Sequence, residues 1–351
     1  MEKNKKRRFK LFDLQKEGKG ISKNQTELEP GLKRFFVSYK NNFSKLITVN
    51  IILVLGNFPI FFLIAALAGV SQNDVFYPLS DFFQNVNGII AADGGVTPYK
   101  VTLFAIEGLQ SQDFAPTVIT YILYGIGALT LFTFGPVNAG TAYVLRNMVK
   151  GEHVFVWADF VYALKRNIKQ ALPFGIFDIG INALLCWNIY SMIFSESAFI
   201  TSMLFWCNVV IFIFYFFMRY YIYVQMVTFK LSVFKILKNS LIFSLLGIKR
   251  NIMALLGIVV FIVIEIFLLL GTGAILLPVA LAALLCVLFA TFAYMKVYAS
   301  YFKIKQIMID PYLAEHPELA EEEPEDDDVI MRDDVTERER LEAIKRKNNM
   351  L

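Results

Sequence analysis

Histidine is nearly absent from this 351-residue sequence, which contains only His153 and His316. Neither falls in a long apolar segment, so the sequence offers no histidine at membrane depth for an intramembrane protease or metalloenzyme. There is also no Gly-x-Ser-x-Gly, no phosphate-binding P-loop and no Gly-x-Gly-x-x-Gly before a helix. His153 could sense pH, but a loop histidine without partner ligands is more often merely polar. We therefore expect no catalysis, no cofactor and no metal.

Cysteine is equally scarce, with three residues in the chain: Cys186, Cys207 and Cys286. All three fall in apolar segments and none forms a Cys-x-x-Cys pair, so neither a disulfide framework nor a zinc site is expected. We expect small, buried apolar side chains instead. No cleavable signal peptide is expected, because the first apolar segment begins near Leu46 after a charged arm and is long enough to stay in the membrane.

Long apolar segments are what the sequence has in abundance. Apolar residues make up 56% of the chain and the mean hydropathy is +0.53, whereas a soluble domain is nearer ~45–50% apolar. A helix crosses a bilayer with roughly 20 residues. Segments of about that length cover residues 46–70, 116–145, 170–194, 199–227, 251–270 and 274–294. The sequence therefore predicts an all-α polytopic membrane protein, with six transmembrane helices arranged as three hairpins.

Positive charge is almost absent from alternate loops between these segments. Of the 34 Lys and Arg residues, Lys100 alone falls in the loops after the first, third and fifth spans. The others lie in the N-terminal arm, in the loops after the second and fourth spans, in the C-terminal segment, or at Arg219 near the inner end of the fourth span. Basic loops stay in the cytoplasm. We therefore predict a bacterial cytoplasmic-membrane protein with both termini in the cytoplasm.

Apolar residues also recur at helical spacing among the basic residues that precede the odd-numbered spans. The three stripes are Leu32, Phe35, Phe36, Tyr39 and Phe43; Trp157, Phe160, Val161, Leu164 and Ile168; and Phe229, Val233, Ile236, Leu237 and Leu241. Each predicts a basic amphipathic helix on the membrane surface, with Trp157 and Phe160 among the headgroups. Either the chain repeats a surface helix plus hairpin three times, or basic residues followed by apolar ones simply suit any crossing from the cytoplasm.

Charge also divides the chain into regions. Residues 1–30 are predicted to be a disordered basic cytoplasmic arm, and residues 31–311 a six-span membrane domain with an extracellular loop at 71–115. The last helix is expected to continue towards Pro311. Residues 312–351 form an acidic and mixed-charge cytoplasmic tail. The expected partner of the basic surfaces is a bilayer with anionic headgroups, and no nucleic acid is expected.

The most distinctive stretch runs from Phe134 to Leu172. Its recurring elements are Gly135-Pro136 with Ala139 and Gly140, Tyr143-Val144-Leu145-Arg146-Asn147, Glu152-His153-Val154-Phe155-Val156-Trp157-Ala158-Asp159-Phe160, and Lys165-Arg166-Asn167-Ile168-Lys169-Gln170-Ala171. Together with Leu14-Gln15-Lys16-Glu17-Gly18-Lys19-Gly20-Ile21-Ser22-Lys23, this stretch resembles the YesL-like family of bacterial membrane proteins. The residues that we single out from it are Gly135, Pro136, Gly140, Arg146, Asn147, Trp157, Asp159, Phe160 and Asn167.

This resemblance implies a genomic context and no mechanism, since the family is largely uncharacterised and is often encoded beside carbohydrate ABC transporters. The resemblance thus makes such a transporter an expected partner. One departure is clear. In typical members a Pro-Ile at the end of the first span runs almost directly into the Gly-Pro, whereas here a long insertion separates Pro59-Ile60 from Gly135-Pro136.

Two carboxylates fall inside predicted spans, Asp178 in the third and Glu265 in the fifth. A charge at that depth costs ~2.5–3.5 kcal/mol even on the lenient insertion scale. Asn182, one turn after Asp178, shares its face. These three residues either line a polar track or act as contacts between helices, with one or both carboxyls protonated. Arg219 precedes an aromatic run and is expected to snorkel to the interface.

Two functions follow as hypotheses. The first is a non-catalytic accessory or regulatory partner of a carbohydrate uptake system, as the family resemblance implies. The alternative is a secondary transporter or permease that uses Asp178 and Glu265. The sequence lacks the cytoplasmic Glu-Ala-Ala loop of an ABC permease subunit, which argues against that kind of permease.

Overall fold

The computed structural model describes residues 29–78, 98, 110–194, 199–270, 275–316 and 331–332. Almost all of the predicted N-terminal arm (1–30), most of the tail (312–351) and the middle of the loop 71–115 lie outside the described residues. The same holds for the family-like stretch at the N-terminus, residues 14–23.

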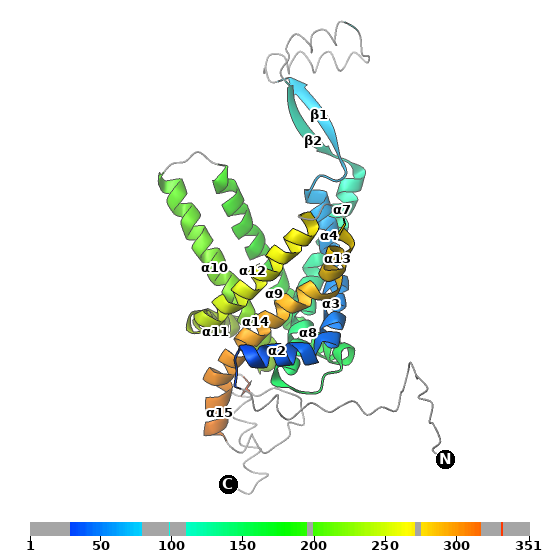
Figure 1. Cartoon of the computed structure of the whole chain (residues 1–351). Helices are drawn as coiled ribbons and strands as arrows, with labels where there is room; N and C mark the ends of the chain where they lie inside the picture. Colours follow the sequence, from blue (N-terminus) through cyan, green and yellow to red (C-terminus); the bar gives the residue numbers. More distant parts are fainter. Residues whose placement is uncertain are drawn as a thin grey trace, which may run out of the picture.

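Helices dominate the described chain, and Figure 1 shows their arrangement. They are α2 (Leu32–Asn41), α3 (Phe43–Gly56), α4 (Pro59–Leu67), α7 (Val118–Ala128), α8 (Thr130–Lys150), α9 (Val156–Ile193), α10 (Phe199–Thr228), α11 (Val233–Leu246), α12 (Ile248–Leu270), α13 (Leu277–Ala283), α14 (Phe289–Ile304) and α15 (Asp310–Glu315), with π-helical turns η1 (Leu284–Leu288) and η2 (Lys305–Ile309). The strands are β1 (Gln72–Pro78), β2 (Gln110–Pro116), β3 (Phe229–Lys230) and β4 (Met331–Arg332), and β3 and β4 pair in parallel.

Five helical segments of the described chain are long and apolar enough to cross a membrane. They are Val118–Lys150, Val156–Ile193, Phe199–Thr228, Ile248–Leu270 and Leu277–Glu315. A sixth results if α3 and α4, which meet at a bend of 56°, form one broken span. The predicted class of an all-α polytopic membrane protein is confirmed at this level, and the last helix does continue past Pro311.

The bend between α3 and α4 has a local cause. Pro59 has no N–H to donate and therefore cannot continue a helix, but it suits the first turn of a new one. It stands at the start of α4. Asn57, between the two helices, donates its side-chain Nδ2 to the carbonyl oxygen of Leu53 at 3.1 Å. The first predicted span is therefore two helices meeting at an angle.

The predicted boundary between a surface helix and the third span is wrong. Residues 156–193 form the single helix α9, about 57 Å long at ~1.5 Å per residue. No glycine interrupts the join, and Asn167 donates to the carbonyl oxygen of Ala163 at 2.9 Å, one turn back in the same helix. The other two amphipathic helices are separate from the spans that follow them, since α2 ends at Asn41 and α11 ends at Leu246.

The segment 71–115, predicted only as an extracellular loop, contains a β-hairpin. Strands β1 and β2 pair antiparallel in a register that joins Gln72 to Pro116, and the pair projects beyond the end of the helices (Figure 1). Thr117 and Thr120 form a capping box at the start of α7. Both hydroxyls also donate to the carbonyl oxygen of Ser71 at 2.6 Å. The base of the hairpin is thus fastened to the first turn of α7.

Helix α8 lies at the centre of the bundle and packs against α3, α9, α10 and α14. Its crossing with α9 depends on two glycines that face each other. A Cβ added at Gly135 would lie 2.8 Å from Cα of Gly175 and would also collide with the carbonyl oxygen of Ala171. Close helix contact of this kind requires small residues. A second close contact joins the same helices, since a Cβ at Gly140 would lie 2.6 Å from the ring of Phe160.

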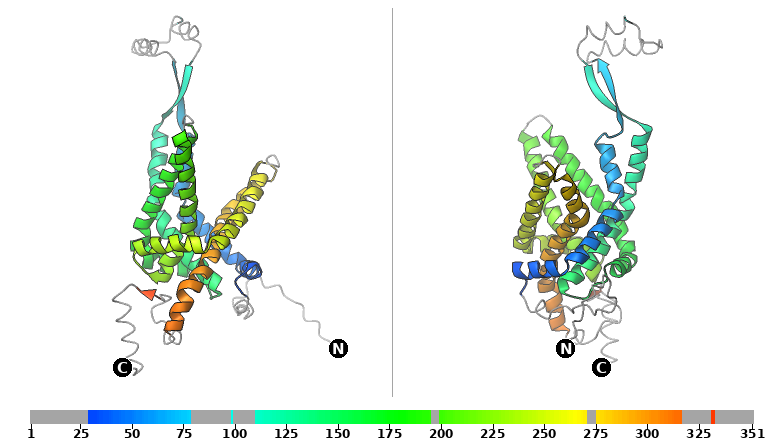
Figure 2. Two further views of the ribbon diagram at one scale, coloured as in Figure 1. Left: turned by 90° about the vertical axis from the view of Figure 1, so that its left-hand side faces the viewer. Right: turned by 45° about the vertical axis from the view of Figure 1, so that its right-hand side comes forward.

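Apolar side chains also cover much of the outside of the bundle. The far halves of α9 and α10 and most of α12 expose large apolar residues, and Figure 2 shows α12 inclined to the α9–α10 pair. The three cysteines are also exposed, Cys186 on α9, Cys207 on α10 and Cys286 on η1, so their predicted burial is wrong. A bilayer solvates such apolar surfaces, which explains why they need no protein cover.

Candidate functional site

Asp178 is completely buried within the fold and is the acceptor for four donor groups. Its Oδ1 accepts from the hydroxyl of Tyr215 at 2.8 Å and from Nδ2 of Asn182 at 2.8 Å. Its Oδ2 accepts from the hydroxyl of Tyr223 at 2.9 Å and from Nε of Arg219 at 3.1 Å. The same Nε lies 3.0 Å from Oδ1, so the guanidinium forms an ion pair with the carboxylate.

This network corrects the predicted position of Arg219, which turns towards Asp178 instead of snorkelling to an interface. The donors Tyr215, Arg219 and Tyr223 recur every four residues on α10, and that spacing places them on one helix face. The spacing was visible in the sequence and could have identified the partner face. Asn182 lies beside Asp178, as predicted.

Glu265, the other predicted member of a polar track, does not join this network. It lies on α12 and is 7% exposed, and its Oε1 is buried without a hydrogen-bond partner. Among the described residues, no hydrogen bond or ion pair links it to Asp178. The structure therefore assembles Asp178 and Asn182 at one place and leaves Glu265 outside it. It shows no continuous track through both carboxylates.

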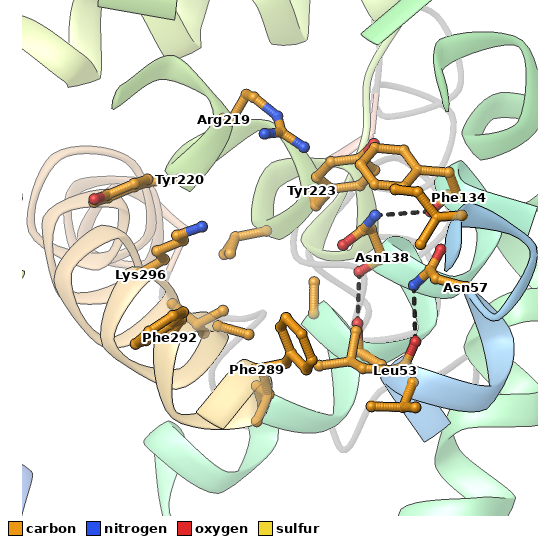
Figure 3. Close-up of a pocket in the computed structure, with 18 of the residues that line it drawn as sticks. Leu53, Asn57, Phe134, Asn138, Arg219, Tyr220, Tyr223, Phe289, Phe292 and Lys296 are labelled. Atoms are coloured by element: carbon orange, nitrogen blue, oxygen red, sulfur yellow. Dashed lines mark hydrogen bonds between the residues drawn. The ribbon is translucent and has the colours of Figure 1, made fainter. Parts of the chain in front are cut away.

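Beside the Asp178 network lies a cavity of about 340 Å³. Helices α3, α4, α8, α10 and α14 surround it, together with Asn57 between α3 and α4, and Figure 3 shows how their side chains converge. Its polar and aromatic lining consists of Asn57, Phe61, Phe134, Asn138, Thr141, Arg219, Tyr220, Tyr223, Phe289, Phe292 and Lys296. No acidic residue is among the residues that line it.

Two cations face this cavity from different helices. Arg219, from α10, has Asp178 behind it and lies 5.6 Å from the ring centroid of Phe134. Lys296, from α14, has its Nζ 5.3 Å from the centroid of Phe216 and 5.8 Å from that of Tyr220. Figure 3 shows the Lys296 amine at the left of the cavity and the Arg219 guanidinium at its top. Within the described part of the chain, Lys296 has aromatic partners but no carboxylate partner.

Amides add polar groups on the opposite wall. Asn138 donates to the carbonyl oxygen of Phe134 at 2.8 Å, and Asn57 donates to that of Leu53. Oδ1 of Asn57 is buried with no hydrogen-bond partner. Since buried polar atoms are normally paired, this orphaned oxygen marks a position at which a bound molecule could donate a hydrogen bond.

The family-like residue Arg146 is buried and connects the ends of α8 and α10. It was predicted to lie in a basic loop, but it is 1% exposed near the end of α8. Its guanidinium donates to Oδ1 of Asn147 at 2.8 and 3.0 Å and to the carbonyl oxygen of Val227 at 3.1 Å. Arg166 also reaches the Val227 carbonyl, at 3.4 Å. Cations near the last carbonyls of a helix are favourable, so both arginines stabilise the end of α10.

Three further family-like residues, Trp157, Asp159 and Phe160, lie in the first turns of α9. Asp159 accepts a hydrogen bond at Oδ2 from the backbone N–H of Phe155 at 2.9 Å, at the start of the helix. Phe160 is 6% exposed and packs on α8, so its predicted place among headgroups is wrong. Trp157, one turn earlier, is 66% exposed. The stretch that dominates the sequence thus builds the α8–α9–α10 junction and lies next to the cavity.

Comparison with known proteins gave no match to a protein-family model, a curated protein or a solved structure.

Proposed function

We propose that this multi-pass membrane protein binds a small anionic ligand in the cavity between α3, α8, α10 and α14. The observation that carries the proposal is Lys296, a cation that lines the cavity without a carboxylate partner among the described residues. The charge distribution of the sequence supports a bacterial cytoplasmic membrane with both termini in the cytoplasm.

The argument from charge begins with the two cations. Asp178 offsets the charge of Arg219, which leaves Lys296 as the excess positive charge of the site. Removing an ammonium from water costs several kcal/mol unless an opposite charge compensates it. The rings of Phe216 and Tyr220 supply a part of that compensation, since a cation over an aromatic ring gains about 0.5–2 kcal/mol. A bound carboxylate or phosphate would supply the rest.

The rest of the lining indicates what accompanies the anionic group. Apolar and aromatic side chains dominate the cavity wall, and a few amides and hydroxyls stand among them. This is the usual composition of a small-molecule site, and the volume falls at the lower end of the ~300–1,000 Å³ range for ligand pockets. A compact ligand with one anionic group, an apolar or ring-shaped body and a hydrogen-bond donor for Asn57 fits this chemistry.

Thermal stability of the detergent-purified chain tests the proposal. A panel of small carboxylates and phosphates is compared with the matching neutral amides and alcohols, because a ligand that binds only the folded state raises the unfolding midpoint. We expect some anions, and none of their neutral analogues, to stabilise the wild type. The variant Lys296→Met keeps the apolar stem of the side chain and removes its charge. Its apparent affinity for the anion, measured from the shift in unfolding midpoint, should be at least tenfold weaker. Lys305→Met is the matched control, because Lys305 is an exposed lysine on the continuation of the same helix.

Two results would contradict the proposal. One is equal stabilisation by anions and their neutral analogues. The other is a Lys296→Met variant that responds to the anions as the wild type and Lys305→Met do.

Transport of the bound anion is a second candidate function of this cavity. Flux of the stabilising anion into proteoliposomes would support a secondary transporter, with Arg219 and Lys296 in place of the predicted pair of carboxylates. Binding without flux would support a receptor or regulator.

The accessory role in carbohydrate uptake, which the resemblance to YesL-like proteins implies, has one structural feature in its favour. The β1–β2 hairpin projects beyond the helices and provides a surface that no described part of this chain covers (Figure 1). If the hairpin contacts a carbohydrate ABC transporter, replacing residues 72–116 with a short linker should abolish co-purification of that transporter's permease subunits while leaving the protein in the membrane. Undiminished co-purification would contradict this role of the hairpin.

A further inference from the structure

A second and larger cavity lies at the end of the bundle where α2 crosses α14. It has a volume of about 600 Å³ and takes its walls from α2, from α12 between Lys249 and Phe261, and from the middle of α14. Figure 1 shows these three helices meeting on the side of the bundle away from the hairpin. The cavity is separate from the one that contains Lys296, and the two share no lining residue.

The lining of this groove is apolar along most of its length. Phe35, Phe36, Met253, Val260 and Met295 are among its walls. Several wall residues also face outwards: Phe36 is 64% exposed, Val260 is 55% exposed and Met253 is 44% exposed. The groove is therefore continuous with the apolar outer surface of α12.

Most polar groups of the groove already have partners within the protein. The hydroxyl of Tyr39 is 2.8 Å from that of Thr291, and the hydroxyl of Tyr298 donates to the carbonyl oxygen of Gly31 at 2.8 Å. These contacts fasten α2 across α14. They leave the basic pair at the start of α12 as the polar feature of the groove with no partner.

That pair consists of Lys249 and Arg250, which both line the groove. The Nη1 of Arg250 is buried and has no hydrogen-bond partner, and in the described chain neither residue forms an ion pair. They stand in the first turn of α12, where the partial positive charge of the helix end makes cations unfavourable and anions favourable. An anionic group would therefore satisfy the free guanidinium nitrogen, both side-chain charges and the helix end together.

We propose that this groove binds one anionic phospholipid from the surrounding leaflet, with its phosphate on Arg250 and Lys249 and an acyl chain along the apolar wall. The outward-facing residues favour a lipid over a free phosphate, because the groove opens onto the surface that lipid covers. A phosphate alone would leave the apolar wall empty. The bound lipid would rest against α2, α12 and α14 at once and would hold α2 in its place across the bundle.

The test measures the unfolding midpoint of the detergent-purified full chain as lipid is added. The additives are phosphatidylglycerol, phosphatidylcholine with the same acyl chains, and inorganic phosphate. We expect saturable stabilisation by phosphatidylglycerol and little by the other two. Each basic residue near an anionic lipid contributes on the order of 1 kcal/mol, so Arg250→Gln should weaken the apparent affinity about fivefold. Arg250→Lys should restore much of it.

Lys238→Gln is the matched control, since Lys238 is an exposed lysine on the neighbouring helix α11 and does not line the groove. It should respond to phosphatidylglycerol as the wild type does, and so should Lys296→Met, which alters only the other cavity. If Arg250→Gln does not fold, the exposed Lys249 is replaced by Gln, with the same expected direction. Three results would each overturn the proposal: equal stabilisation by phosphatidylcholine, an unchanged response of both groove variants, or full stabilisation of the Lys296→Met variant by inorganic phosphate alone.

Discussion

Substitutions of Asp178 and Arg219 should have non-additive effects on the free energy of unfolding, because the two side chains form an ion pair. Asp178 has no exposed surface, and the side chain of Arg219 is 23% exposed. Removing one member of a buried pair leaves an uncompensated charge and costs about 3–5 kcal/mol. Because Arg219 retains some access to solvent, Asp178→Asn should cost about 3 kcal/mol, at the lower end. Arg219→Met leaves the fully buried carboxylate and should cost at least as much.

The double variant Asp178→Asn/Arg219→Met removes both charges together. Its loss of stability should be smaller than the sum of the single losses by about 2 kcal/mol, within the range found for residues in contact. Reversible unfolding in mixed detergent–SDS micelles measures all four proteins. A control cycle pairs Asp178→Asn with Gly125→Ala, where the added Cβ meets no atom within 4 Å, and should be additive. Additivity of the Asp178 and Arg219 losses within about 0.5 kcal/mol would refute the coupling.

Three further predictions concern packing and topology. Gly135→Ala should destabilise the fold by about 1–3 kcal/mol, because the new Cβ meets backbone atoms of α9 that cannot turn aside; an unchanged midpoint in thermal unfolding would contradict this crossing. Phe160→Glu should cost several kcal/mol while Trp157→Glu, at an exposed position, should change the midpoint in detergent little; equal effects would place both side chains in one environment. A reporter active only outside the cell should work when fused at Gly94 and fail at Lys150, and activity at Lys150 would contradict the topology.

The fold class could be predicted because the bilayer demands long apolar helices and leaves few alternatives. The ends of the individual helices were harder to predict. Hydropathy marks where apolar residues stop, but α9 begins at Val156, well before its apolar part, since nothing breaks the helix in between. The β1–β2 hairpin escaped prediction because its strands are separated by 31 residues, from 79 to 109, and pairing over such a distance leaves no local signal.

The candidate site could be predicted in part for a similar reason. A carboxylate at membrane depth is energetically costly, so Asp178 could be identified as a candidate site residue from the sequence alone. Its partner Arg219 could not be identified in this way, because the depth of a residue along a helix does not show the direction in which its side chain points. Arg219 could equally have faced lipid headgroups. Lys296 was assigned to the cytoplasmic charge beyond the sixth span, since that span was predicted to end at Tyr294. The helix continues beyond that point, as expected, but the sequence did not show that Lys296 on this continuation lies on the wall of a cavity.

An experimental density map of the protein saturated with its best-stabilising anion tests the central claim most directly. We predict density for the anionic group between Nζ of Lys296 and the guanidinium of Arg219, with the body of the ligand against the aromatic wall formed by Phe289 and Phe292. Asp178 should keep its ion pair with Arg219. An empty cavity under saturating conditions, or an anion bound elsewhere with Lys296 unchanged, would contradict the proposed function.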